Sequence, residues 1–83
     1  MEEKLSKKGE LLKTKEGDLL LVNEKGNAYI VEESIVVIWN SFQDKTVEEV
    51  IEEIAVMINR DKEEIREPIK EIVNYLKEAE LLA

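Results

Sequence analysis

The sequence is most constrained by three short apolar runs in its first third and by the short loops that separate them. The runs cover residues 11–14, 19–22 and 28–31. The loop before the second run contains Gly17, and the loop at residues 23–27 is rich in Asn and Gly, which tolerate the positive φ of tight turns. Loops this short join only antiparallel neighbours, because parallel strands need a long crossover. The sequence therefore predicts a three-stranded antiparallel meander with residues 19–22 in the middle.

Three amphipathic segments with helical spacing follow the strands. The first covers residues 32–42. The second begins with a capping box formed by Thr46 and Glu49, and the third begins at Asp61 in a similar way. Pro68 lies inside the third segment, where it predicts a kink or an irregular first turn. The element order is thus βββααα, which places the chain in the α+β fold class.

One domain is expected over residues 10–83, preceded by a flexible N-terminal arm over residues 1–9. Large aromatic side chains gain most from burial, so Trp39 and Phe42 are expected to anchor the core. Leu81 and Leu82 are expected to fold back onto it.

The residue types present exclude several kinds of chemistry. The 83 residues include no Cys and no His. This removes disulfides, thiol and imidazole catalysis, and zinc sites built on these ligands. The many Glu side chains lie on solvated helix faces, where nothing drives the pKa values of two carboxyls apart as acid–base catalysis requires. We therefore expect no enzyme activity, no catalytic residue, no metal site and no cofactor.

The composition also bears on where the protein works. The first ten residues contain no apolar run, so neither a signal peptide nor a membrane span is expected there. Absence of disulfides in so small a chain is typical of a reducing cytoplasm. A composition rich in Glu, Lys and Ile is typical of a thermophilic source.

Charge is distributed unevenly along the chain. Residues 1–31 contain six basic and six acidic side chains, whereas residues 32–83 contain six basic and fourteen acidic ones, so the formal net charge of −8 belongs to the helical part. A DNA-binding helix needs a basic face, because phosphate neutralisation supplies most of the affinity. The charge distribution therefore argues against nucleic acid as a partner.

Three segments resemble a known family. Residues 29–39, YIVEESIVVIW, look like the strand-to-helix junction of PqqD-like proteins, where an aromatic residue precedes Leu-Asn-Glu-Thr and a later Ile-Trp. Residues 46–50, TVEEV, resemble the Thr-Val-Glu-Glu-Ile that follows, and residues 75–82, YLKEAELL, resemble the Leu-x-x-Leu-x-x-x-Gly-Leu-Leu ending. The likeness covers about residues 10–82. Glu32 stands where the family usually has Asn, which brings the usual cap of the first helix into question.

The resemblance implies a winged-helix-like domain of the kind called a RiPP recognition element. Such domains bind the leader segment of a ribosomally made precursor peptide and deliver it to a modifying enzyme, typically a radical S-adenosylmethionine enzyme. The leader is expected to add a strand beside the third strand and to place side chains against the third helix. The peptide-binding residues are then expected to be Asn27, Ala28, Tyr29, Ile30, Val31, Ile65, Arg66, Ile69 and Lys70.

Two features of the predicted sheet agree with this expectation without deciding it. Residues 27–31 contain no Lys or Pro, which usually protect an edge strand, although a helix or loop of the same domain also covers such edges. Residues 19–22 are apolar on both faces, and three helices cover only one face of so small a sheet. The other face then meets the arm, a second subunit or a partner. The alternatives to peptide capture are a dimerisation or docking module and a winged-helix DNA-binding protein.

Overall fold

The computed structural model describes residues 2–83. The chain forms a three-stranded antiparallel sheet in the order β1-β2-β3, followed by three helices. This confirms the predicted α+β arrangement, with β2 and β3 at the predicted residues and β1 one residue earlier. The elements are β1 (Glu10–Lys13), β2 (Leu19–Val22), β3 (Ala28–Val31), α1 (Glu33–Ser41), α2 (Val47–Ile58) and α3 (Lys62–Glu78).

Both hairpins are closed in the same way. In the first, Thr14 N–H donates to the Asp18 carbonyl at 2.9 Å, and in the second, Asn23 N–H donates to the Asn27 carbonyl at 3.0 Å. Each loop ends in a glycine with positive φ just before its closing residue. These closing pairs fix the register, in which Leu12 lies opposite Leu20 and Leu20 lies opposite Ile30.

The helix starts follow the sequence prediction. The Thr46 hydroxyl accepts a hydrogen bond from Glu49 N–H at 3.1 Å, and the Glu49 carboxylate accepts one from Thr46 N–H at 2.9 Å, so the capping box of α2 is confirmed. The Asp61 carboxylate accepts from Glu63 N–H at 2.9 Å at the start of α3. Glu32, by contrast, makes no side-chain capping bond to α1.

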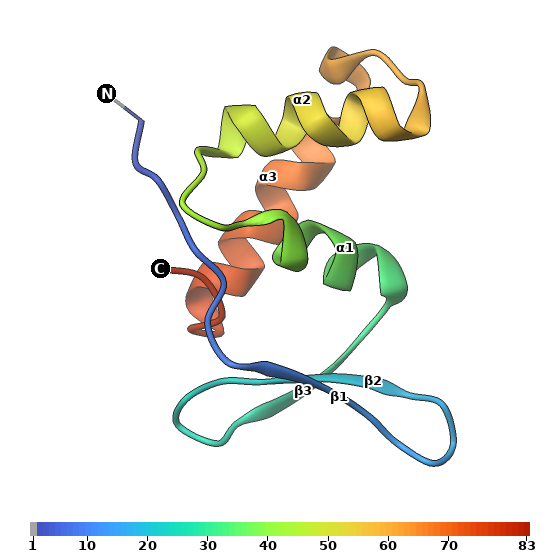
Figure 1. The fold of residues 1–83 in the computed structure, drawn as a ribbon, viewed down its shortest axis with the longest axis vertical. Helices are drawn as coiled ribbons and strands as arrows, with labels where there is room; N and C mark the ends of the chain where they lie inside the picture. The colour runs from blue at the N-terminus through green and yellow to red at the C-terminus, as the bar shows by residue number, and fades with distance from the viewer. Residues whose placement is uncertain (1) are drawn as a thin grey trace.

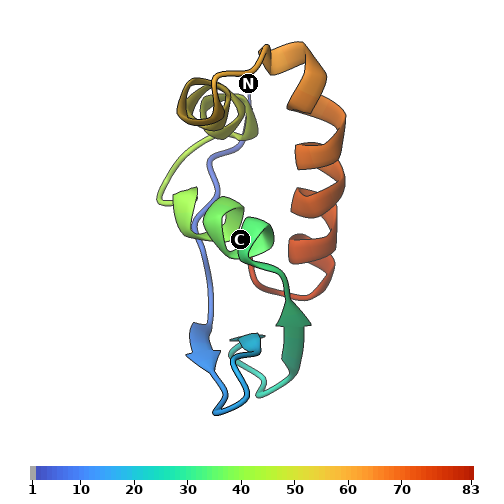
Figure 2. The same cartoon turned by 90° about the vertical axis from the view of Figure 1, so that its right-hand side faces the viewer.

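All three helices lie on one side of the sheet (Figures 1 and 2). The two views agree that α2 is farthest from the strands and that α3 passes from the α2 end of the molecule down to the sheet. α3 is one helix through Pro68, and the kink predicted there stays a prediction. No helix within residues 2–83 lies over the outer face of the sheet.

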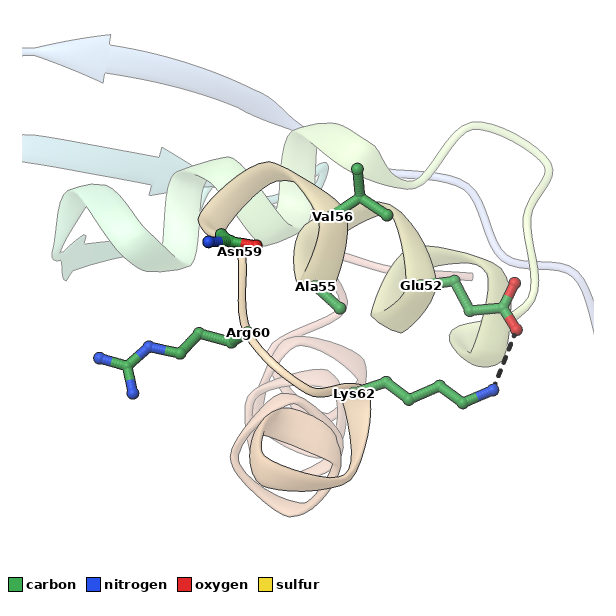
Figure 3. A pocket seen from close by; sticks show the side chains of 6 residues that line it. All are labelled: Glu52, Ala55, Val56, Asn59, Arg60 and Lys62. Carbon is green, nitrogen blue, oxygen red and sulfur yellow. Dashed lines mark ion pairs between the residues drawn. The ribbon is translucent and has the colours of Figure 1, made fainter.

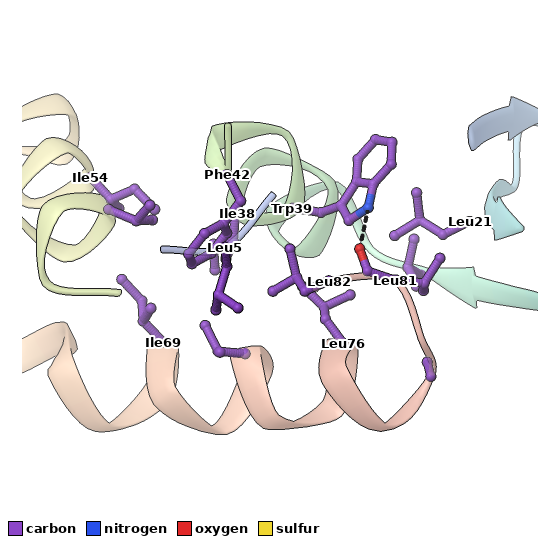
Figure 4. Close-up of a cluster of buried hydrophobic side chains, with 14 of the residues drawn as sticks. Leu5, Leu21, Ile38, Trp39, Phe42, Ile54, Ile69, Leu76, Leu81 and Leu82 are labelled. Atoms are coloured by element: carbon purple, nitrogen blue, oxygen red, sulfur yellow. Dashed lines mark hydrogen bonds between the residues drawn. The ribbon is translucent and has the colours of Figure 1, made fainter. Parts of the chain in front are cut away.

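The core fills the space between the inner face of the sheet and the helices. Trp39 and Phe42 are both buried, as predicted, and so are Leu81 and Leu82 of the C-terminal tail. The Trp39 indole N–H donates to the Leu81 carbonyl at 3.0 Å (Figure 4). It also lies 3.2 Å from the Lys8 carbonyl. One aromatic side chain therefore joins α1 to both ends of the chain.

The N-terminal segment, where the sequence predicts a flexible arm, packs against the domain in the structure. Leu5 is buried and exchanges two backbone hydrogen bonds with Lys45, at 2.7 and 3.1 Å. Ser6 does the same with Ala83, at 2.8 and 3.1 Å. Figure 1 shows this segment running beside the C-terminal tail before it enters β1. Residues 5–8 thus connect the α1–α2 loop to the tail, and only residue 1 of the expected arm lies outside the described residues.

Candidate functional site

The outer edge of β3 carries backbone groups that no other described part of the chain uses. The closing pair of the hairpin sets the alternation of the ladder, so Tyr29 and Val31 exchange hydrogen bonds with β2. The N–H and C=O groups of Ala28 and Ile30 therefore point away from β2. Within residues 2–83, no backbone hydrogen bond from outside the sheet reaches residues 28–31. This edge is open to an added strand.

The open edge is shorter than the sequence analysis expects. The Asn27 carbonyl accepts from Asn23 N–H at 3.0 Å, and Asn27 N–H donates to the Asn23 side-chain oxygen at 3.0 Å. Both backbone groups of Asn27 are occupied by the turn, so the free edge begins at Ala28. Asn23 is buried, and its side-chain amide donates to the Ala79 carbonyl at 2.8 Å. This bond fixes the hairpin beneath the C-terminal end of α3.

An aromatic pair lies beside the open edge. The rings of Tyr29 on β3 and Tyr75 on α3 meet edge to face, with centroids 6.2 Å apart and planes at 84°. Together with Glu78 and Ala79 they line a shallow hollow of about 180 Å³ between β3 and the last turns of α3. Side chains of an added strand that faced the helices would enter this hollow. Tyr75 is not among the site residues predicted from the sequence, although it continues the apolar stripe of α3.

A larger apolar hollow lies farther along α3. It has a volume of about 350 Å³ and is bordered by all three helices. Ile65, Pro68 and Ile72 line it and occupy the same face of α3 as Tyr75, because they are spaced at three and four residues. An apolar stripe therefore leads from the tyrosine pair to this hollow. Its other lining residues are Ser34, Val37, Ile38, Ile54, Met57, Ile58 and Ile69.

Five of the predicted site residues fall into three groups in the structure. Tyr29 and Ile30 lie at the open edge, on the inner and outer faces of the sheet, while Val31 is buried in the core. Ile65 and Ile69 line the larger apolar hollow rather than the space beside β3. The C-terminal half of α3, not the half that carries Ile65, is thus the part nearest to β3.

The basic residues of α3 are mostly engaged within the domain. Arg66 is only 22 % exposed, bonds the Glu48 carboxylate of α2, and lies 3.0 Å from a Glu63 oxygen. These contacts hold the pKa of both carboxyls below the ordinary value and raise that of the guanidinium. Lys62 and Lys77 also form ion pairs, so Lys70 is the one basic side chain of α3 without an ion pair among the described residues. α3 therefore has little free positive charge for a phosphate backbone.

The other edge of the sheet differs from β3. By the same alternation, the outward groups of β1 belong to Leu11 and Lys13. Lysine on an edge strand is a common protection against pairing with another chain. No tyrosine pair corresponding to Tyr29 and Tyr75 flanks β1 in the described part of the chain. The sheet thus offers one edge suited to strand addition.

A further hollow lies at the corner between α2 and α3. It measures about 530 Å³ and is lined by a mixture of charged and small side chains (Figure 3). Lys62 pairs with Glu52 across it at 3.5 Å, and the side chain of Arg60 points away from them (Figure 3). No lining side chain is a hydroxyl or thiol nucleophile. The remaining lining residues are Ala55, Val56 and Asn59.

Two negative findings apply to residues 2–83. No group of three acidic or other metal-ligating side chains converges on one point. No helix combines the length and apolar character needed to cross a membrane.

Comparison with known proteins decides the family. A family model described as Coenzyme PQQ synthesis protein D (PqqD) matches residues 19–82, from β2 to the buried tail. The chain belongs to the PqqD family. PqqD is a non-catalytic chaperone family, and PqqD-like proteins bind precursor peptides for modifying enzymes. The PqqD match contains β3, the tyrosine pair and all of α3, and it leaves out β1 and the N-terminal segment. Comparisons with curated proteins and with solved structures gave no match.

Proposed function

We propose that this PqqD-family chain is an adaptor that captures the leader segment of a ribosomally made precursor peptide by strand addition to β3. The observation that carries the proposal is the free backbone edge at Ala28 and Ile30, flanked on its inner side by Tyr29 and Tyr75. Main-chain hydrogen bonds at such an edge supply affinity, and pockets for alternate side chains supply specificity. The chain then presents the bound segment to a separate modifying enzyme, for which a radical S-adenosylmethionine enzyme is the best candidate.

The hollows along α3 support two kinds of side-chain contact. A residue facing the helices from the added strand meets the tyrosine pair. A segment that continues along α3 reaches the apolar hollow at Ile65 and Ile69. The stripe from Tyr75 back to Ile65 spans about 15 Å of helix at a rise of 1.5 Å per residue. An extended peptide covers that distance in about five residues.

Charge contributes less to this proposal than the sequence analysis expects. Arg66 is held between Glu48 and Glu63, so a guest carboxylate has to compete with two existing partners. Lys70 remains available among the described residues for an acidic side chain of the leader. We propose that backbone pairing and apolar contacts dominate recognition, with Lys70 adding a weak preference for acidic residues.

An amide NMR titration with a synthetic candidate leader tests the proposal. Shifts are expected in residues 28–31 and in the C-terminal half of α3, from Ile72 to Ala79. Ala28→Pro removes an outward N–H without removing a bond to β2 and is expected to weaken binding at least tenfold. Lys13→Pro, which makes the same change on the β1 edge, is the matched control and is expected to bind normally. Shifts confined to α2, or equal weakening by both prolines, would contradict strand addition at β3.

A further inference from the structure

The outer face of the sheet carries an apolar row that ends at the open edge. Leu12, Leu20 and Ile30 lie directly opposite one another across the three strands and therefore share a face. Leu12 is 46 % exposed and Ile30 72 % exposed, whereas Leu20, flanked on both sides, is only partly exposed. Ile30 is more exposed than Leu20 because one of its two cross-strand positions is empty.

The hydrogen-bond alternation places one residue of the added peptide strand, called the guest below, in that empty position. The N–H and C=O groups of Ile30 are both free. In an antiparallel complex, Ile30 therefore forms a hydrogen-bonded pair with the guest residue opposite it. Residues directly opposite each other point to the same face of a sheet. The side chain of that guest residue therefore points outward, beside Ile30. Its two neighbours in the guest point inward, toward the tyrosine pair and α3.

We infer that the captured segment is recognised on both faces of the sheet, with an apolar, preferably β-branched residue opposite Ile30 that extends the row of Leu12, Leu20 and Ile30. The inference rests on the proposed function and adds a specificity-determining residue to it. It predicts a guest that is apolar at three consecutive positions, because the two inward-facing neighbours are also apolar. A guest recognised by the helix side alone would need apolar residues only at alternate positions.

The outer face of the sheet, of which the apolar row is a part, is too small for a stable dimer interface. Three strands of four residues, spaced about 4.8 Å apart and rising about 3.4 Å per residue, present roughly 200 Å². A stable interface needs about 800 Å² from each partner. An added strand, in contrast, needs only the position next to Ile30. The size of the row thus favours the guest peptide over a second copy of the chain.

Selection from a displayed library of random 15-residue peptides tests the inference. Selection on the wild-type protein is expected to enrich peptides with three consecutive apolar residues. Selection on Ile30→Lys is expected to enrich peptides with Asp or Glu at the central of these three positions. Leu12→Lys is the matched control, since it introduces the same charge into the same row two strands away from the guest. It is expected to leave the selected pattern unchanged. Replacing the central apolar residue of a selected peptide with Ser is expected to weaken binding to wild type by roughly two- to fivefold.

The possible failures are distinguishable. Peptides that keep an alternating pattern for wild type and for Ile30→Lys would overturn the two-face inference and leave strand addition intact. The two-face inference would also be overturned, with strand addition intact, if Ile30→Lys and Leu12→Lys changed the selected peptide sequences equally. A library that yields no binder, or binders unaffected by Ala28→Pro, contradicts the proposed function itself. Circular dichroism of both lysine variants checks that they fold, as expected for side chains this exposed.

Discussion

Tyr75 of α3 lies edge to face against Tyr29 of β3, with 6.2 Å between the ring centroids, and so connects the helix layer to the open edge of the sheet. The contact places an aromatic surface on the inner side of the position that an added strand would occupy. Because Tyr75 is still 39 % exposed, part of its ring remains free to contact a guest. The pair thus serves both the packing of α3 and the shape of the candidate site.

Replacing Tyr75 separates these two roles. Tyr75→Ala is expected to lower the free energy of unfolding by at least about 1 kcal/mol, because an aromatic pair contributes about that much beyond the apolar area that it buries. It is expected to weaken peptide binding by more than tenfold, since the floor of the hollow is lost. Tyr75→Phe keeps the ring and should retain most of the affinity. Calorimetric titration and thermal unfolding measure the two effects, and a variant that loses stability but not affinity would remove Tyr75 from the site.

Much of the fold follows from local chemistry in the sequence. Residues 19–22 and 28–31 form strands as the sequence predicts, because turn-forming residues lie on both sides of the first run and before the second, and the helical period that follows marks the end of the second. The capping box at Thr46 and Glu49 likewise needs only four consecutive residues to be recognised. Features of this kind depend on neighbours in the chain and are therefore visible without a structure.

The parts that sequence reasoning missed depend on distant residues. Leu5 is a single apolar residue in a charged segment, and Lys45, with which it exchanges backbone hydrogen bonds, lies far along the chain. The sequence places Arg66 in the expected peptide site because helical spacing relates it only to its own helix, whereas Glu48 approaches from α2. No pattern indicated that the Tyr75 end of α3 lies nearer to β3 than the Ile65 end. These relationships arise from the way that the helices pack.

The ion pairs of Arg66 predict a dependence of stability on pH. Hydrogen bonds from Arg66 are the largest cause of the lowered pKa of Glu48 and Glu63, with Lys62 assisting both and Lys70 assisting Glu48. A carboxyl with a lowered folded-state pKa contributes stability above its unfolded pKa, and this contribution is lost as the pH falls through the folded value. Thermal unfolding is therefore expected to shift to lower temperature as the pH falls from about 5 toward 3, because the unfolded pKa is about 4.3.

A pair of neutralising variants checks the source of this effect. Glu48→Gln is expected to lower the unfolding temperature at pH 7 and to flatten its decline in acid. Glu71→Gln changes a helical carboxylate that has no ion pair among residues 2–83, and it should retain the acid dependence of the wild type. If both variants retain that dependence, the Arg66 cluster is not its source.

The packed N-terminal segment predicts that Leu5 contributes to stability. Leu5 is only 2 % exposed and belongs to the main core cluster. Leu5→Ala is expected to lower the free energy of unfolding by about 2–5 kcal/mol, as for other buried leucines. Val56→Ala, at a residue 83 % exposed, is the control and should change it by less than about 0.5 kcal/mol. Denaturant unfolding measures both, and a loss at Leu5 no larger than the control would indicate a flexible arm.

Gly9, where the N-terminal segment turns into β1, is expected to be irreplaceable for a steric reason as well as a conformational one. Its φ is +84°, and a Cβ built there would lie 2.1 Å from the Val22 carbonyl oxygen. Gly17 has a similar φ of +95°, but a Cβ there would meet nothing within 4 Å. Gly17→Ala therefore isolates the cost of positive φ, about 1–2 kcal/mol. Gly9→Ala adds a backbone clash and is expected to cost at least twice as much in denaturant unfolding. Equal losses would mean that the segment can move away from β2 at no cost in stability.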